Sequence, residues 1–391
     1  MVEKSCLGLV IIILLAGAWP AAAQDAPLQD VLTDLVTRRT VSVGDFPRDP
    51  TAAETTARTL VSTVLQAVAT LPVPLPSQGL LYRFNPRLGV PERDSRTFGP
   101  MLLARPLTAR AGHGSWAVDE RYVEFASLNG GDLRSGTFVS AAHRVTGAPQ
   151  AFDEERLTLR LSMRTTTVVA GYGLADRLEV GAALPIVTVN VEGQRLNFNG
   201  GVGVLQTTAD AGDTGLGDLQ LRVKNHFVGE GDNGLAADVQ VRLPTGSEEN
   251  LRGAGQASAR VGLVAGRTVG AATVYGNVAH ARGGLADETQ AGGGIVAVVT
   301  PRLTASAELL ARHFHGLRRA VPVAALHPSL PGIETNRIER AGDPLRLYQV
   351  STGVKWSVAG TWLLTGQLLW TVNDAGLRAV VAPSVALEYL F

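Results

Sequence analysis

Charged residues stand at alternate positions of several stretches of the sequence, where they could line a water-filled passage. In residues 157–164, apolar side chains hold the odd positions and polar side chains hold the even ones, which is the period of a β-strand. If the odd residues face lipid, Arg160 and Arg164 point into the lumen of a barrel. The same reasoning selects these lumen-lining candidates: Arg160, Arg164, Arg222, Lys224, Asp238, Arg242, Arg260, Glu308 and Lys355.

The inward-facing residues carry an excess of positive charge in this interpretation. Their expected carboxylates are Glu179, Asp238, Glu308 and Glu388. Rings of cations in a narrow passage favour anions. An equally good alternative is a network of cross-strand ion pairs that fills and stiffens the barrel, and both can hold together.

Residues that would support catalysis or ligand chemistry are sparse. The sequence contains neither G-x-S-x-G nor H-E-x-x-H, and its glycine runs match no nucleotide-binding loop. His313 and His315 share one strand face, but no third metal ligand has suitable spacing. We therefore expect no enzyme, no cofactor and no metal site.

The two-residue period continues along most of the chain from Phe98 onward. It recurs in residues 219–227, 235–243, 362–372 and 385–391. Many of these stretches are near the roughly 9–11 residues that a tilted strand needs to cross a bilayer. The sequence predicts an all-β fold, a transmembrane antiparallel up-and-down β-barrel of about 12–14 strands over residues 99–391.

Connection lengths support this architecture, because bacterial barrels have short periplasmic turns and longer outer loops. Counting back from a periplasmic C-terminus makes the outer connections residues 373–377, 315–344, 283–288, 244–256, 191–215 and 146–153. The periplasmic connections are all short, at residues 359–360, 301–302, 269–270, 229–234, 173–176 and 128–133. Arginines in the long connection 315–344 are suited to lipopolysaccharide phosphates, to solvent, or to a constriction.

Aromatic residues fall near the predicted periplasmic strand ends, where amphipathic rings favour the membrane interface. The expected interface aromatics are Tyr172, Phe227, Trp356, Trp362 and Phe391. The last strand alternates through Val385, Leu387, Tyr389 and Phe391, and resembles the C-terminal signal that the barrel-insertion machinery reads. We expect outer-membrane lipid, lipopolysaccharide and that machinery as partners.

The N-terminus has the pattern of a secretory leader. Lys4 precedes an apolar run, and Ala21–Ala23 offers a cleavage site, so residues 1–23 are predicted to be a signal peptide. Residues 24–98 follow as a helical segment, in the periplasm or plugging the lumen. Its apolar residues have helical spacing, and Pro72, Pro74 and Pro76 end it.

Composition excludes several other classes. Lys and Arg number 35, as do Asp and Glu, and no basic run is interleaved with aromatics, so we expect no nucleic-acid partner. The single cysteine, Cys6, lies in the leader. Export and a barrel together predict the outer membrane of a Gram-negative bacterium.

Two neighbouring stretches resemble a known family. Residues 214–224 contain Gly-Leu-Gly-Asp followed by a strand, and residues 237–246 end in Arg-Leu-Pro-Thr-Gly. This pairing resembles the outer-membrane transporters of the MetA-pathway of phenol degradation family, and the resemblance covers residues 155–391. It implies a barrel and the uptake of small solutes, aromatic compounds among them.

Two functions therefore remain open. The first is a porin-like channel or transporter for small solutes, aromatic or anionic, with a cationic lumen. The second is a non-conducting structural or interaction barrel, whose N-terminal helices bind a periplasmic partner through Leu60, Val64 and Val68.

Overall fold

The structure, a computed structural model, describes residues 26–38, 47–74, 82–85, 90–93 and 95–391. They form a closed antiparallel barrel of 12 strands preceded by two helices, which confirms the predicted fold class at the lower end of its strand range. The predicted signal peptide lies outside the described residues.

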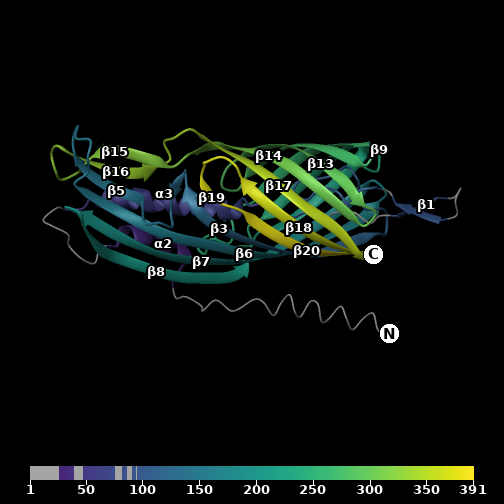
Figure 1. The fold of residues 1–391 in the computed structure, drawn as a ribbon, viewed down its shortest axis with the longest axis horizontal. Coiled ribbons are helices and arrows are strands. Elements are labelled where there is room, and N and C mark those ends of the chain that lie inside the picture. The colour runs from purple at the N-terminus through teal and green to yellow at the C-terminus, as the bar shows by residue number, and fades with distance from the viewer. Residues whose placement is uncertain (1–25, 39–46, 75–81, 86–89, 94) are drawn as a thin grey trace.

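Consecutive wall strands pair antiparallel around the barrel, and the last closes on the first, with Ser384 opposite Arg121 and Leu390 opposite Ser115. Figure 1 shows the tilted wall strands and the C-terminus at one end of the barrel. The wall strands are β3 (Gly114–Leu128), β6 (Asp153–Ala175), β7 (Leu178–Asn199), β9 (Leu219–Glu230), β10 (Asn233–Leu243), β11 (Ser258–Val269), β12 (Ala272–Gly283), β13 (Glu288–Thr300), β14 (Leu303–Arg318), β17 (Pro344–Ala359), β18 (Trp362–Thr371) and β20 (Ala382–Leu390).

A strand extension continues the barrel at the end opposite Phe391 (Figure 1). β6 and β7 have 23 and 22 residues in all, which is more than a strand needs to cross a bilayer. Their outer parts are the longest members of the extension. The shorter strands of this end are β4 (Gly131–Asp132), β5 (Phe138–Val145), β8 (Val202–Leu216), β15 (Val321–Leu326), β16 (Ile333–Glu339) and β19 (Leu377–Ala379). The connection 315–344, expected as a loop, thus contains the hairpin β15–β16, and β16 pairs with β5.

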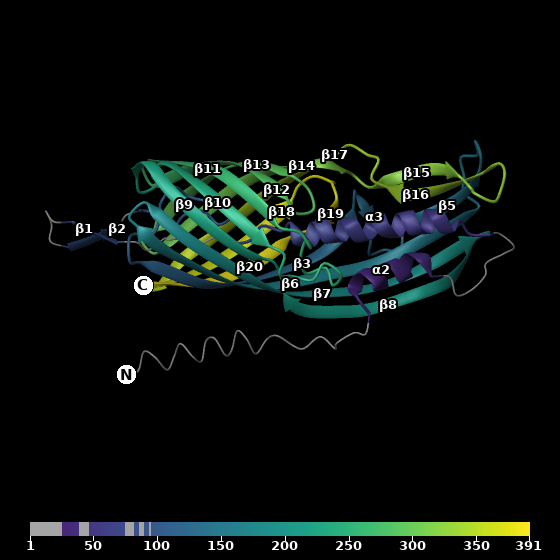
Figure 2. The same ribbon diagram turned by 180° about the vertical axis from the view of Figure 1, so that it is seen from behind.

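Two helices, α2 (Leu28–Thr37) and α3 (Pro50–Ala69), pack inside this extension (Figure 2). Asp49 caps α3, since its side chain accepts a hydrogen bond from Ala52 N at 3.0 Å, and Pro50 occupies the first turn, where no backbone donor is needed. Leu60 and Val64 of α3 belong to one buried apolar cluster with strand residues such as Leu159.

This packing reverses the predicted orientation of the clearest alternating segment. Leu157, Leu159 and Leu161 are fully buried against the helices, whereas the Arg160 side chain is 66% exposed and Arg164 also lies on the outer surface. The assignment of Arg160 and Arg164 to the lumen is therefore wrong. In the extension the inner face of β6 is apolar because it packs against the helices. Alternation alone therefore assigned the apolar side chains to the wrong face.

One predicted connection also lies at the other end. β3 begins beside Phe391 and runs away from it, so the turn after Leu128 lies next to Gly376, where Asn129 N donates to Gly376 O at 2.9 Å. Residues 128–133 are therefore not a periplasmic turn. The stretch 138–145 is confined to the extension as β5, so β3 pairs directly with β6. The barrel therefore has one membrane-crossing strand fewer in this region than the loop assignment implied.

The described residues before Gly114 form no strand of the wall, although residues 111–113 bond to Gly173 of β6. The two-stranded sheet of β1 (Tyr82–Asn85) and β2 (Val90–Arg93) lies beyond the C-terminal end of the barrel (Figure 1). Residues 95–113 then run within the barrel, hydrogen-bonded to inward-facing wall residues, until β3 begins at Gly114. We call residues 95–113 the lumen segment. The wall thus begins at residue 114 rather than 99.

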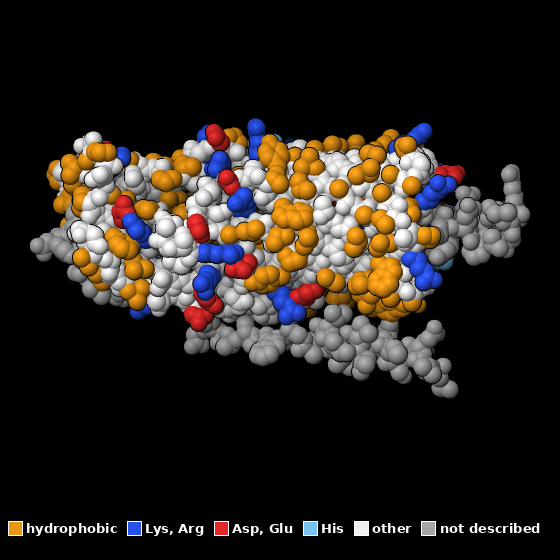
Figure 3. Space-filling model, in the orientation of Figure 1, with side chains coloured by type: hydrophobic (Ala, Val, Ile, Leu, Met, Phe, Trp, Pro, Cys, Tyr) orange, Lys and Arg blue, Asp and Glu red, His pale blue; other side chains and the backbone are white. Residues whose placement is uncertain are grey.

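The outer face of the wall is apolar. Its exposed residues alternate along the strands, for example Leu221 and Val223 in β9 and Val261 and Leu263 in β11. In Figure 3 hydrophobic side chains cover the barrel between two bands of charged side chains, one near the C-terminal end and one where the extension begins. A closed barrel with such a belt is the architecture by which strands span an outer membrane. No helix in the described part of the chain has the length and apolar character needed to cross a membrane.

Candidate functional site

The barrel interior near the C-terminal end is occupied by the lumen segment. Glu308, on the inner face of β14, accepts hydrogen bonds from three consecutive backbone N–H groups, those of Met101, Leu102 and Leu103, at 2.7, 2.8 and 2.7 Å. Ser306 donates to the same carboxylate at 3.0 Å. One buried carboxylate therefore fixes the tip of the lumen segment by charge-assisted hydrogen bonds.

Two buried lysines hold the flanks of this segment. Lys355 Nζ donates to Pro100 O at 2.6 Å, and Lys224 Nζ donates to Leu107 O at 2.6 Å. Glu179 lies 3.4 Å from the Lys224 ammonium and accepts from Ala109 N at 2.8 Å. The wall thus offers donors to the segment's carbonyls and acceptors to its amides, as buried backbone groups require.

A third contact lies near the C-terminal end of the barrel. Arg105 of the lumen segment pairs with Asp232, in the turn between β9 and β10, with Nε and Oδ1 2.9 Å apart, and Ser95 donates to the same carboxylate. Both side chains of the ion pair are almost fully buried. Apolar contacts add to these polar ones, since Phe98, Leu103 and Ala104 each belong to a small buried cluster with wall residues.

Farther from that end, wall arginines bind the C-terminus of α3. The last carbonyls of a helix have no partner within the helix, and cations are favoured there. Arg312 donates to Thr70 O at 2.7 Å, Arg242 donates to Ala69 O, and Arg121 donates to Pro72 O. Two layers of chain therefore occupy the lumen, the end of α3 and the lumen segment.

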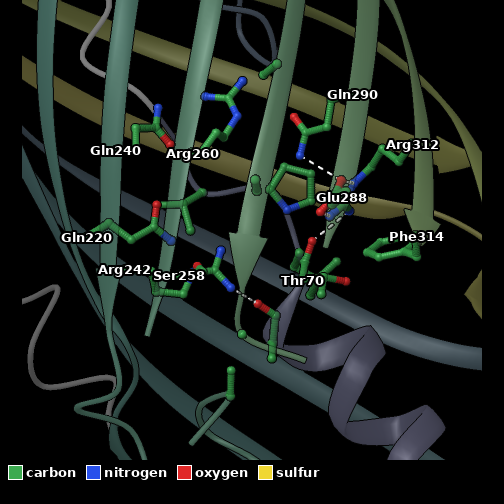
Figure 4. Close-up of a pocket in the computed structure, with 18 of the residues that line it drawn as sticks. Thr70, Gln220, Gln240, Arg242, Ser258, Arg260, Glu288, Gln290, Arg312 and Phe314 are labelled. Carbon is green, nitrogen blue, oxygen red and sulfur yellow. Dashed lines mark hydrogen bonds and ion pairs between the residues drawn. The ribbon is translucent and has the colours of Figure 1, made fainter. Parts of the chain in front are cut away.

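A cavity of about 140 Å³ separates these two layers. Leu71, Pro72 and Val73 line it on one side and Leu102, Leu103 and Ala104 on the other. Figure 4 shows the polar wall residues grouped around it, with Arg312 bonded to Glu288 and to Thr70. The wall residues of its lining include Gln220, Gln240, Arg242, Arg260, Asn277, Glu288, Gln290, Leu310, Arg312 and Phe314.

Solved structures similar to this chain are outer-membrane channels and transporters. The COG4313 outer membrane channel from Pseudomonas putida F1 is 13% identical, with a TM-score of 0.46 over 73% of this chain and 97% of that chain. The P. putida toluene transporter TodX is 12% identical, with a TM-score of 0.35 over 72% and 90%. The KdgM porin in complex with disordered oligogalacturonate is 6% identical, with a TM-score of 0.32 over 70% and 99%.

At such identities the likeness concerns the barrel fold alone and does not indicate which solute is transported. No family model matches the sequence. No curated protein matches it either. The resemblance to the MetA-pathway of phenol degradation family stays a prediction.

The remaining lumen-lining candidates lie on the inner face of the wall. They are largely buried. Lys224, Glu308 and Lys355 bind the lumen segment, and Arg242 and Arg260 line the cavity. Arg222 and Asp238 pair with each other. Carboxylates accompany the cations, since Arg222 and Arg260 share Asp238 at 3.5 and 3.1 Å. Ion pairs between inward-facing side chains, the alternative interpretation of these charges, are thus present on several strands of the wall.

Sequence reasoning missed several interior residues. Glu288 and Arg312 form a bidentate pair at 2.6 and 2.9 Å, but Glu288 ends one predicted loop and Arg312 lies just before another. Arg105 and Asp232 lie where no alternation marks an inner face. Arg312 stands at the right parity in β14, two and four positions beyond Leu310 and Glu308, and that spacing could have revealed it.

Strand register brings predicted interface aromatics to the Phe391 end of the wall, since Trp362 lies opposite Tyr389 and Tyr172 lies opposite Gly114, which bonds to Phe391. Tyr172, Phe227, Trp356 and Phe391 are exposed. Trp116, which the sequence analysis overlooked, packs edge-on against Trp362 with ring centroids 5.8 Å apart. Val385 and Phe391 of the predicted insertion signal are exposed, with Leu387 and Tyr389 half-buried. The rings of His313 and His315 are 4.6 Å apart, and the described residues contain no group of three or more potential metal ligands.

Proposed function

We propose that this protein is an outer-membrane channel for the uptake of small solutes, in which the lumen segment is the inner gate. The observation that carries the proposal is the way this segment is held. It occupies the lumen through Glu308, Lys224, Lys355 and Asp232, by polar contacts with the wall. Hydrogen bonds of this kind add only about 0.5–3 kcal/mol each to stability, because water can replace them.

The two layers of the closure differ in this respect. The helices are fixed to the extension by an apolar cluster that includes Leu32, Leu60 and Val64, and separating it would expose apolar surface to water. The apolar contacts of the lumen segment are smaller, three separate clusters at Phe98, Leu103 and Ala104, and the side chains that hold its backbone are polar groups that water can solvate. The lumen segment is therefore the part expected to move, while the helices remain in place.

Replacing Glu308 by Gln is expected to increase the conductance of the purified barrel in planar bilayers. The substitution removes the charge that three N–H groups share, and places an amide NH₂ group against donors. A loss of about 2 kcal/mol from the closed state would raise the open population roughly thirtyfold.

The matched control for this experiment is Glu192→Gln, since Glu192 is an exposed carboxylate on β7. It should conduct as the unmodified protein does. If Glu308→Gln conducts no more than this control, and removal of residues 95–108 opens no pathway either, the channel proposal is wrong.

A closed structural barrel is the second candidate, and buried ion pairs such as Arg105–Asp232 favour it because they add rigidity. The helix surface predicted to bind a periplasmic partner is not accessible, however. Leu60, Val64 and Val68 are buried within the apolar cluster that the helices form with the chain's own strands, so they are not available to a periplasmic protein. The absence of conductance in every variant would support this second candidate.

Assembly in the outer membrane is part of the same proposal, with lipid, lipopolysaccharide and the insertion machinery as partners. Phe391 closes the barrel through two backbone hydrogen bonds to Gly114, both 3.0 Å, and its ring is exposed beside Tyr389. Phe391→Ala keeps the backbone bonds and removes the ring. We expect severalfold less heat-modifiable barrel in outer-membrane fractions than for Phe227→Ala, which removes an exposed ring at the same end. Equal amounts would exclude a signal at the last residue.

A further inference from the structure

The cavity between the two layers combines cationic and apolar lining in a small volume. Three arginines, Arg242, Arg260 and Arg312, line it together with a single carboxylate, Glu288. Apolar surface comes from Leu71, Leu102, Leu103, Leu310 and Phe314. Figure 4 shows the guanidinium groups arranged around the space, with Arg242 and Arg260 on the neighbouring strands β10 and β11 and Arg312 on β14.

The charges of these arginines are unequally compensated. Glu288 binds Arg312 through both of its oxygens, and Arg260 shares Asp238 with Arg222. Among the described residues, Arg242 hydrogen-bonds to the backbone carbonyl of Ala69 and forms no ion pair within 4.0 Å. The cavity therefore has a local excess of positive charge, although the lumen as a whole contains many paired carboxylates.

A buried polar group beside the cavity has no partner. The Asn277 side chain on β12 lines the cavity and is 8% exposed, and its Oδ1 accepts no hydrogen bond from any described residue. Burying an acceptor without a donor costs free energy, so native proteins seldom leave one empty. A carboxylate has no donor for this oxygen, but a 180° rotation of the amide exchanges its oxygen and nitrogen and presents N–H donors to the cavity, which an anion would accept.

We propose that the cavity binds a small carboxylate with a compact apolar body, about the size of a single six-membered ring. An engineered apolar cavity of about 150 Å³ holds benzene, which sets the scale for the 140 Å³ present here. Arg242 would receive the carboxylate, and the leucines and Phe314 would cover the body. The lining includes Gly284, Leu285 and Ala286 of the connection between β12 and β13, so the occupant would enter from the side of the extension.

This inference rests on the proposed function, because a bound solute reaches the periplasm only if the lumen segment moves. The test is calorimetric titration of the detergent-purified full chain with cyclohexanecarboxylate and, in a separate experiment, with its uncharged amide. We expect the carboxylate to bind at least tenfold more tightly than the amide. Arg242→Gln and Asn277→Asp should each weaken carboxylate binding about tenfold or more, because the first removes a positive charge and the second adds a negative one.

Arg160→Gln is the matched control, since it removes an exposed cation from the outer surface and should leave binding unchanged. Equal affinity for the carboxylate and the amide, or binding that survives both cavity substitutions, would overturn the inference, as would no binding at all. Conductance separates this failure from that of the proposed function. A barrel that conducts but does not bind refutes the cavity assignment alone, whereas one that binds but never conducts in any variant refutes the channel.

Discussion

Oxidation of a chain carrying Ala104→Cys and Ala236→Cys is expected to abolish solute conductance, and reduction is expected to restore it. Ala104 belongs to the lumen segment and Ala236 to the wall strand β10, and both lie in one small buried cluster with Val264. A disulfide there would tie the lumen segment to the wall. If this segment is the gate, the tied channel cannot open.

The chain suits this experiment because its natural cysteine, Cys6, precedes the predicted cleavage site. The introduced pair would thus be the only thiols of the mature protein, and the crosslinked fraction can be counted by mass after blocking free thiols. Ala104→Cys alone, treated with the same oxidant, controls for the substitution. It should conduct equally before and after treatment.

A fully crosslinked barrel that conducts like its reduced form would show that solutes pass without movement of the lumen segment. The gate would then be sought at the end of α3, where Arg121, Arg242 and Arg312 bind the chain. The two closures are therefore separable, because Ala104 and Ala236 lie on the C-terminal side of the cavity and these arginines act on the other side.

Much of the barrel could be predicted from sequence because a lipid-facing wall imposes a strict two-residue period. In β9, β10 and β20 the outer face is apolar and the inner face is largely polar, and Lys224, Asp238 and Glu388 are buried. Chain direction followed from the C-terminal strand. It was wrong only before β6, where β5 looked like a crossing strand but stays in the extension.

The interior could not be predicted in the same way. Alternation shows that a strand has two faces, but not which face is inside when the interior is filled by helices, as happened at Leu157 and Arg160. The lumen segment has no period at all, since its backbone, rather than its side chains, makes many of the contacts with Glu308, Lys224 and Lys355. The cavity results from two segments far apart in the chain, and no local pattern encodes it.

Replacing Glu155 by Ala is expected to release α2 and the start of α3 from the extension. Glu155 is buried on β6 and binds two arginines, with Arg48 at 2.5 Å and Arg195 at 2.6 Å. Arg195 is fully buried and also donates to Leu35 O at 3.0 Å. Removing the carboxylate takes the Glu155 charge away from both arginines, and breaking such a buried pair typically costs about 3–5 kcal/mol.

Limited proteolysis of the folded barrel would measure this release, with cleavage within residues 26–74 as the readout and heat modifiability as proof that the wall is intact. Glu334→Ala is the matched control, because its ion pair with Arg144 is also in the extension but is partly exposed, at 21% and 32%. Such a pair contributes about 1 kcal/mol or less, so its loss should leave the helices protected. Equal protection of both variants would mean that the apolar cluster around Leu32 and Val64 holds the helices by itself. Selective cleavage after loss of Glu155 would show that this buried triad, placed where the helices meet β6 and β7, orders the outer closure of the barrel.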